Sequence, residues 1–235
     1  MKIKEEILTE EKLGFDLKGM VSQKLLGYHD FITAIVTALE SRDLYTEFHS
    51  MRVADMSQQI CCFLGIDSGF SEIVHIAAHV HDIGKIGISD SVLLKTGSLT
   101  DSEWQEMKKH PVIGYSILSK VSGFSEISEI VLHHHERWDG TGYPDGLCGI
   151  EIPLGSRIIA VADSIDAMMS SRTYRQGMSA QRCREEIERN IGTMYDYDIA
   201  VCVLEHWNMI VEVRNDFNSF SQVKKYGTGI FHSDG

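Results

Sequence analysis

The chain has 235 residues, 43% hydrophobic and 24% charged, which is typical of a soluble globular protein with a real core. Its net charge of −12 excludes a broad surface for polymeric nucleic acid, because such a surface neutralises many phosphates. The five cysteines include no CxxC pair, which argues against a disulfide framework or a thiolate zinc site. With no signal-peptide core and no apolar stretch long enough to span a membrane, a cytoplasmic location is expected.

The first half of the chain reads as helices joined by loops. Residues 1–21 are charged and are expected to form a flexible or helical leader. From residue 22 to 64 apolar positions recur at helical spacing, and Gly65 is placed as a helix stop. Ser71 is a candidate cap for the next helix, which is expected to end at the HDIGK stretch, residues 81–85.

The second half continues the helical pattern. Thr100 and Glu103 have capping-box spacing, and Pro111 predicts a break at the preceding histidine. Further helices are expected over 125–138, over 157–169 and as a final pair that Ser179 opens, and the glycine-rich segment 139–149 is expected to be a loop. The sequence therefore predicts one all-α domain, residues 22–212, followed by a mobile tail, residues 213–235.

Histidine and aspartate side chains occur where these helices end. The candidate metal ligands are His49, His81, Asp82, His110, His134, His135 and Asp163. Imidazole and carboxylate together suit a divalent transition metal such as iron, manganese or zinc. Adjacent ligands cannot point the same way from a regular helix, so they are expected at helix ends, where Gly84 and Gly140 favour an irregular backbone. His75 and His79, although four residues apart, are not expected to be ligands.

The ordered set of motifs resembles the HD superfamily of metal phosphohydrolases, and in particular its HD-GYP branch. The resemblance is carried by HDIGKIG at 81–87, KKHP at 108–111, HHERWDGTGYPDG at 134–146 and the stretches 152–168 and 171–175. It covers roughly residues 41–207, and it implies an HD-domain-type helical bundle with a GYP-containing loop extension. The chain departs from the family pattern at Gln176 and at MYDYD, residues 194–198, which affects no ligand.

The resemblance implies two divalent metals bridged by Asp82. One metal would be completed by His49, His81 and Asp163, and the other by the remaining three histidines. Four protein ligands per metal leave open positions for water and a phosphate oxygen, as a two-metal hydrolysis requires. Iron or manganese is favoured, with zinc, nickel or cobalt as alternatives. A third metal is not expected, because Tyr45 stands where some relatives have a glutamate.

The resemblance also implies the substrate contacts. Lys85 would act beside Asp82 in catalysis and touch the phosphate, Arg172 and Arg175 would bind phosphates, and the loop residues Gly142 and Tyr143 would contact a guanine base. These cations explain how an acidic protein could bind a polyanion.

The expected function is hydrolysis of cyclic di-GMP to linear pGpG in bacterial signalling, and further cleavage to GMP is left open. Two alternatives remain open. One is hydrolysis of another cyclic dinucleotide such as cyclic GMP-AMP, and the other is a non-catalytic cyclic di-GMP receptor or docking module. A homodimer or a regulatory protein partner is also left open.

Overall fold

The computed structural model describes residues 32–42, 48–171 and 176–215. Within these ranges the chain forms helices and no β-strand, and the only β-type pairings are the isolated bridges Asp139–Cys148 and Ile191–Tyr195. The all-α prediction is therefore confirmed. None of the helices in the described part of the chain combines the length and the hydropathy that crossing a bilayer would require.

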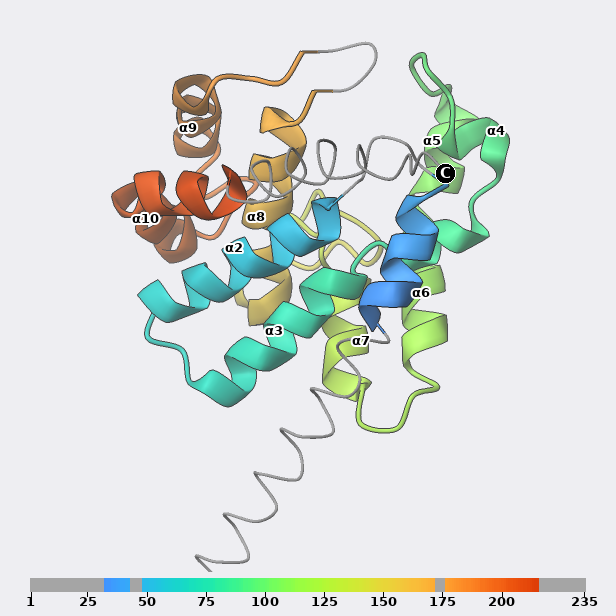
Figure 1. The fold of residues 1–235 in the computed structure, drawn as a ribbon, viewed down its shortest axis with the longest axis horizontal. Coiled ribbons are helices and arrows are strands. Elements are labelled where there is room, and N and C mark those ends of the chain that lie inside the picture. The colour runs from blue at the N-terminus through green and yellow to red at the C-terminus, as the bar shows by residue number, and fades with distance from the viewer. Residues whose placement is uncertain (1–31, 43–47, 172–175, 216–235) are drawn as a thin grey trace, which may run out of the picture.

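Three helices form the centre of the molecule: α2 (His49–Phe63), α3 (Ser68–Val80) and α8 (Leu154–Met169). α2 packs against both α3 and α8, and Figure 1 shows α2 and α3 crossing in front of α8. Fully buried residues from each helix, such as Val53, Ile76 and Ile158, belong to one hydrophobic core. This core fixes the helix ends that carry the polar side chains described below.

A short 3-10 helix, η1 (Ile83–Gly87), follows α3 and packs against α6 (His110–Leu118), which in turn packs against α7 (Ser125–Leu132). Gly84 makes this close packing possible. A Cβ atom at this position would lie 1.9 Å from the carbonyl oxygen of His110, so only glycine fits. The contact brings the start of η1 next to the start of α6.

Two short helices, α4 (Asp90–Leu93) and α5 (Asp101–Met107), lie on the opposite side of Figure 1 from α9 (Ala180–Arg189) and α10 (Tyr197–Glu205). α5 contributes no buried residue. Polar contacts attach it instead: Glu106 accepts a hydrogen bond from the Ser89 backbone at 3.0 Å, and Lys95 pairs with Glu103 at 2.6 Å.

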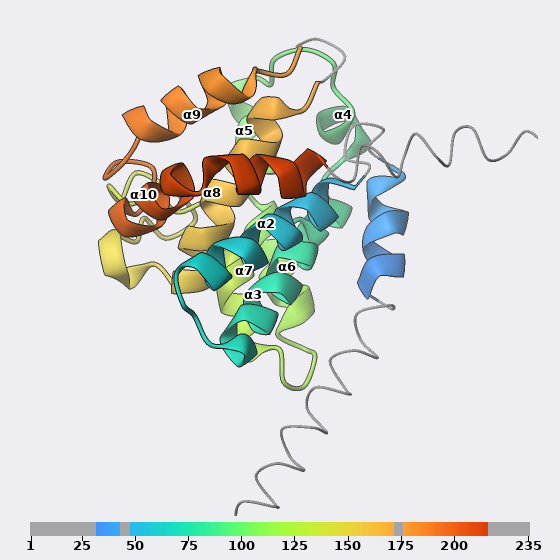
Figure 2. The same ribbon diagram turned by 60° about the vertical axis from the view of Figure 1, so that its left-hand side comes forward.

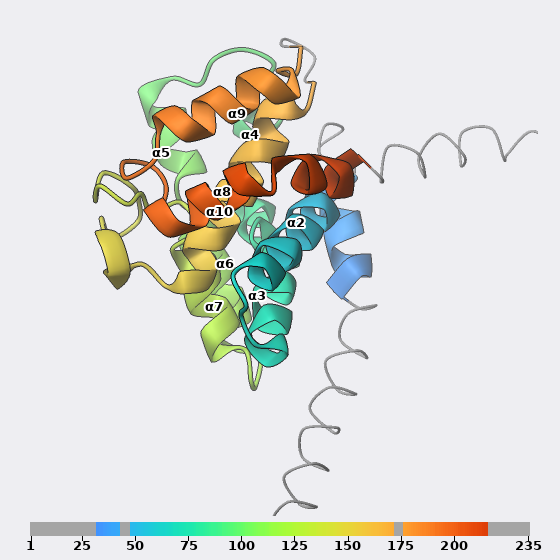
Figure 3. The same cartoon turned by 90° about the vertical axis from the view of Figure 1, so that its left-hand side faces the viewer.

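The chain then forms η2 (Gly149–Glu151), α8, α9 (Ala180–Arg189) and α10 (Tyr197–Glu205), and residues 207–215 are again helical. In Figures 2 and 3, α9 and α10 lie near each other and close over α8. Residues 32–40 form a further helix, whose Ile32 and Val36 are buried in the core.

Several predicted helix boundaries are confirmed. Thr100 and Glu103 form the complete capping box of α5, Ser179 caps α9, and Gly65 ends α2 with a φ of 67°. α6 begins at His110 with Pro111 in its first turn, as the proline indicated.

Two boundary predictions are wrong. Ser71 does not cap α3, because the Asp67 side chain accepts the hydrogen bonds of Gly69 and Phe70 and starts the helix earlier. The helix expected over 125–138 ends at Leu132, because the next three residues form a turn. The domain limits at 22 and 212 stay predictions, and the leader, the end of the tail and Tyr45 lie outside the described residues.

Candidate metal centre

The seven predicted ligands come from the ends of five helices and from the middle of a sixth. His81 is the C-cap of α3 and Asp82 is the N-cap of η1, so this pair lies at a backbone irregularity. His134 and His135 lie in the turn after α7. The other three are the first residue of α2, the first residue of α6 and an inward-facing position of α8: His49, His110 and Asp163.

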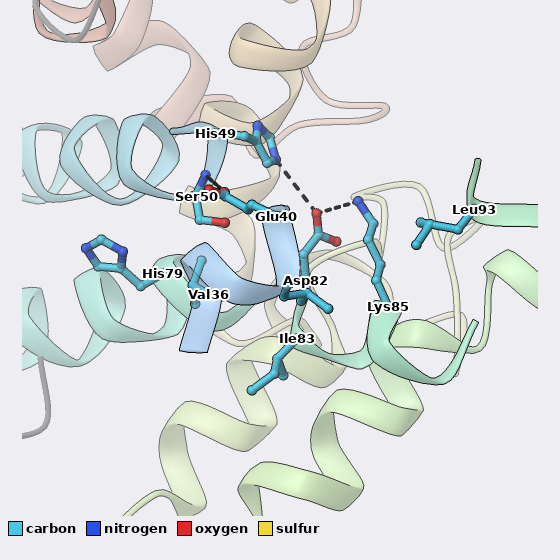
Figure 4. Close-up of a pocket in the computed structure, with 10 residues that line it drawn as sticks. Val36, Glu40, His49, Ser50, His79, Asp82, Ile83, Lys85 and Leu93 are labelled. Carbon is cyan, nitrogen blue, oxygen red and sulfur yellow. Dashed lines mark hydrogen bonds and ion pairs between the residues drawn. The ribbon is translucent and has the colours of Figure 1, made fainter. Parts of the chain in front are cut away.

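These residues converge on one buried cluster, called here the His–Asp cluster (His49, His81, Asp82, His110, His134, His135 and Asp163). Its donor atoms form three groups, within each of which the atoms lie no more than 4.8 Å apart. They are His49, His81, Asp163; His110, His134, His135; and His81, Asp82, His134. The first two groups coincide with the two ligand sets that the resemblance implies, and the third joins them. Neither His75 nor His79 belongs to these groups, and the ring of His79 points away from Asp82 in Figure 4.

Three rings of the cluster are oriented by their own helices. The Nδ1 atoms of His81, His110 and His134 lie 2.7, 2.8 and 2.7 Å from the carbonyl oxygens of Ala78, Met107 and Val131, three residues earlier in each case. A carbonyl oxygen can only accept, so each Nδ1 carries the hydrogen. In the neutral form of each ring the lone pair is therefore on Nε2, the atom that faces the cluster.

This orientation has a consequence for His110 and His134. Their Nε2 atoms lie 3.4 Å apart, and both Nδ1 hydrogens are already donated to the backbone. Two lone pairs aimed at each other in a buried site repel unless a cation or a proton lies between them. The donor set, five imidazoles with two carboxylates, therefore fits transition-metal ions.

Asp82 lies between the two ligand sets. Its Oδ2 is 3.4 Å from His81 Nε2 and 3.8 Å from His49 Nε2, whereas its Oδ1 is 3.4 Å from His110 Nε2. Each carboxylate oxygen therefore faces a different set. This is the placement that a bridging carboxylate needs.

The electrostatics divide the histidines into two kinds. Burial lowers the pKa of His110 to about 4 and that of His135 to about 3, so both rings are neutral near pH 7. Burial, reinforced by His135, also lowers the pKa of His134 well below its ordinary value. Burial alone would lower the pKa of His49 too, but hydrogen bonds to Asp163 and Asp166 outweigh it and raise this pKa to about 10.

The two carboxyl groups of the cluster are ionised. Although burial opposes ionisation, the positive charges of Lys85 and His81 hold the pKa of Asp82 well below its usual range. Burial also opposes the ionisation of Asp163, but its hydrogen bond with His49 lowers the pKa of this carboxyl below its usual range.

Lys85 is the cation nearest the cluster in the described part of the chain. Its Nζ donates to Asp82 Oδ2 at 2.5 Å, and Figure 4 shows Asp82 between Lys85 and His49. Lys85 follows Asp82 by one turn of η1, so the 3-10 spacing of three residues places both side chains on the same side.

The loop that contains the tripeptide Gly142, Tyr143 and Pro144, called here the GYP loop, folds back onto the cluster. The Tyr143 ring lies 4.9 Å from that of His135, and its backbone N–H donates to the His135 carbonyl at 3.2 Å. Gly142 allows this return, because a Cβ atom there would lie 2.4 Å from the Arg137 nitrogen. Glu136 fixes the far side of the loop by accepting backbone hydrogen bonds from Asp145 at 2.7 Å and Gly146 at 2.9 Å.

A cleft of about 780 Å³ opens beside the cluster, within the range of small-molecule sites. Its lining includes His49, Asp82, Lys85, His110, His135, Tyr143 and Asp163 from the predicted site, together with segment 92–99, Trp104 and Met107. Arg172 and Arg175, the predicted phosphate contacts, lie outside the described residues.

Asp166 is the main residue that the sequence interpretation missed. It lies on α8 three residues after Asp163, is 1% exposed, and accepts from His49 Nδ1 at 2.7 Å. Two aspartates at this spacing share one face of a helix, and that pattern was available in the sequence. Trp104 and Lys108 also lie beside the cleft. Lys108 is the first residue of the KKHP motif, but neither residue was assigned to the site from the sequence.

The family model "HD domain" matches residues 35–199 of this chain. A cyclic di-GMP phosphodiesterase of Thermotoga maritima is 41% identical over 205 residues, which are 85% of this chain and 56% of that protein. The response regulator RpfG of Xanthomonas campestris, a cyclic di-GMP phosphodiesterase, is 36% identical over 81% of this chain and 51% of its own length. The chain belongs to the HD-GYP branch of the HD domain family.

Other HD-GYP relatives have a different named substrate. A 3'3'-cGAMP-specific phosphodiesterase of Vibrio cholerae is 34% identical over 88% of this chain and 39% of its own length. Among solved structures, the V. cholerae enzyme V-cGAP3 has a TM-score of 0.62 at 17% identity, over 79% of this chain and 49% of its own. Bd1817 of Bdellovibrio bacteriovorus has a TM-score of 0.56 at 18% identity, over 68% of this chain and 51% of its own. At these identities the structures support the fold alone, and the chain spans about half the length of the first relatives.

Proposed function

We propose that this chain is a metal-dependent phosphodiesterase that hydrolyses cyclic di-GMP to linear pGpG. The observation that carries the proposal is the 3.4 Å approach of His110 Nε2 and His134 Nε2, with both Nδ1 hydrogens committed to the backbone. A cation is the simplest partner for both atoms. Sequence relatives that are named as phosphodiesterases of cyclic dinucleotides support the substrate class.

His49, His81 and Asp163 would bind one metal, and His110, His134 and His135 would bind the other. Asp82 would bridge them, since its two oxygens face different sets. Two bound cations, with iron or manganese favoured, would supply an activated water and neutralise charge on the phosphate.

The chain's own residues have separate tasks. Lys85 contributes a positive charge next to Asp82, where it attracts a phosphate oxygen and stabilises the charge that grows on it. Burial raises the pKa of the Tyr143 phenol, so Tyr143 stays protonated and can donate a hydrogen bond to the substrate. Arg172 and Arg175 remain predicted phosphate contacts, from the sequence alone.

A second candidate substrate is 3'3'-cyclic GMP-AMP, favoured by relatives that are specific for it at 34–37% identity. The third candidate is a receptor that binds a cyclic dinucleotide without cleaving it. The three candidates differ in turnover and product, so one experiment separates them.

The test is hydrolysis of both cyclic dinucleotides by protein purified anaerobically and loaded with iron or manganese. Cyclic di-GMP should be consumed faster than cyclic GMP-AMP. His81→Ala and Asp82→Ala should lose metal and activity together, and His206→Ala, a histidine outside the cluster, should retain both. Binding without turnover under every metal would support the receptor instead, and full metal content in the Asp82 variant would refute the ligand assignment.

A further inference from the structure

Trp104 is exposed at the wall of the cleft instead of packing in the core. It is 44% exposed and lines the cleft, and its helix, α5, buries no residue. An exposed indole contributes little to folding, so its place on a concave surface beside the His–Asp cluster points to contact with a ligand.

Lys108 connects this indole to the GYP loop. Its Nζ lies 5.8 Å from the centroid of the Trp104 ring and 5.2 Å from that of Tyr143. Tyr143 in turn lies 4.9 Å from His135, whose ring is 4.9 Å from that of His110. A continuous row of rings, with one ammonium in it, therefore leads from the cluster to the outer wall of the cleft.

We propose that Trp104 and Lys108 form a purine subsite that selects guanine, in the same cleft that the His–Asp cluster lines. This subsite rests on the proposed function, because it assigns the base of the same substrate. Trp104 stacks on the face of the base, and Lys108 lies at the base edge. Tyr143 closes the subsite on the side of the cluster.

The chemistry of the base explains the selection. An aromatic ring stacks on any base, because every base has a π face. Trp104 therefore contributes affinity but does not distinguish guanine from adenine. An ammonium only donates. Guanine presents two acceptors, O6 and N7, on the edge where adenine has N7 and an amino group, so Lys108 favours guanine.

α5 is held firmly enough for this role. Its N-terminus has the complete Thr100–Glu103 capping box, and the same glutamate pairs with Lys95 at 2.6 Å. Lys95 belongs to the segment that forms the adjoining part of the cleft wall. Trp104 directly follows Glu103, so the contacts that fix the helix start also fix the indole.

The experiment measures binding of 5′-GMP, 5′-AMP and inorganic phosphate to manganese-loaded protein by calorimetry, which needs no turnover. Trp104→Leu should weaken GMP binding at least about five-fold, the lower end of the effect of losing one base–aromatic stack. Phosphate binding should be unchanged, and Trp104→Phe should restore most of the GMP affinity. Tyr197→Leu, which removes an aromatic ring 61% exposed and outside the cleft, is the matched control.

Lys108→Met tests the selection of guanine. The preference of this variant for GMP over AMP should be several-fold lower than that of the native protein, while its affinity for phosphate stays constant. Equal loss of GMP and AMP would overturn the role of Lys108, and equal loss of GMP and phosphate in Trp104→Leu would overturn the subsite. If GMP binding follows these expectations but no cyclic dinucleotide is cleaved, the proposed activity fails and the subsite stands. If a cyclic dinucleotide is cleaved but GMP binding is unchanged in Trp104→Leu, the subsite fails and the proposed activity stands.

Discussion

Asp166 Oδ2 lies 2.7 Å from His49 Nδ1, so a carboxylate outside the His–Asp cluster orients one of the rings of the cluster. Asp166 is itself fixed by Arg52, which donates through Nε at 2.6 Å and Nη2 at 2.9 Å. Arg214 adds an ion pair at 3.0 Å rather than a directed hydrogen bond. The cluster is therefore connected to the helix formed by residues 207–215 through the buried charges of Asp166 and Arg214.

Asp166→Asn should weaken metal binding by about 10- to 100-fold, the usual effect of losing a group that orients a ligand histidine. The amide keeps the volume of the side chain but removes the charge that fixes the Nδ1 hydrogen of His49. Metal affinity, measured by competition with a chelator of known affinity, checks this prediction. Asp198→Asn, on the exposed first turn of α10, should leave it unchanged. Native affinity in Asp166→Asn would show that His49 needs no such partner.

Metal binding at pH 7 should release at least one proton per protein. In the metal-free protein hydrogen bonds to two aspartates, outweighing burial, raise the pKa of His49 to about 10, so the ring is protonated and must lose that proton to coordinate. His110 and His135, with pKa values of about 4 and 3, are already neutral and release none.

Affinity should rise with pH, by up to about ten-fold per unit for one displaced proton, and level off as the pH approaches 10. Calorimetry in buffers of different ionisation enthalpy counts the protons. Binding with no proton release at pH 7 would contradict the charge assigned to His49, and Asp166→Asn should reduce the release.

Much of the cluster could be predicted because its residues are close together in sequence motifs. His81 with Asp82, and His134 with His135, are adjacent pairs that only a helix end can bring together, and both lie at such ends. The fold class followed from apolar spacing and capping signals. These are local properties, and a single sequence contains them.

The contacts that cross the fold could not be predicted in the same way. Arg52 and Arg214 meet at Asp166 from positions far apart in the chain, and no local pattern pairs them. Lys108 lies between two rings because α5 and the GYP loop approach each other, which is a result of tertiary packing. The end of α7 at Leu132 was missed because neither a glycine nor a proline marks a stop before Gly140.

Gly142→Ala should displace the GYP loop. The new Cβ atom would lie 2.4 Å from the Arg137 nitrogen and 2.5 Å from the Glu136 Cα, and backbone cannot yield as a flexible side chain can. We expect a loss of about 1–3 kcal/mol in the free energy of unfolding, as for other overpacked sites. KM for the cyclic dinucleotide should rise, because Tyr143 moves with the loop. Gly97→Ala, where no atom lies within 4 Å, is the control in urea unfolding, and equal stability of both variants would refute the argument.

Lys85→Met should lower kcat while metal content stays at the native level. Lys85 is 2.5 Å from Asp82 but is not a metal donor, so its loss removes charge stabilisation during the reaction and leaves the ligand set complete. Removing one such donor costs about 10²- to 10³-fold in kcat in other enzymes. Lys120→Met, an exposed lysine after α6, should retain the native rate. Loss of metal in Lys85→Met would instead mean that Lys85 acts by keeping Asp82 ionised, since its charge is the largest contribution that lowers the pKa of that carboxyl.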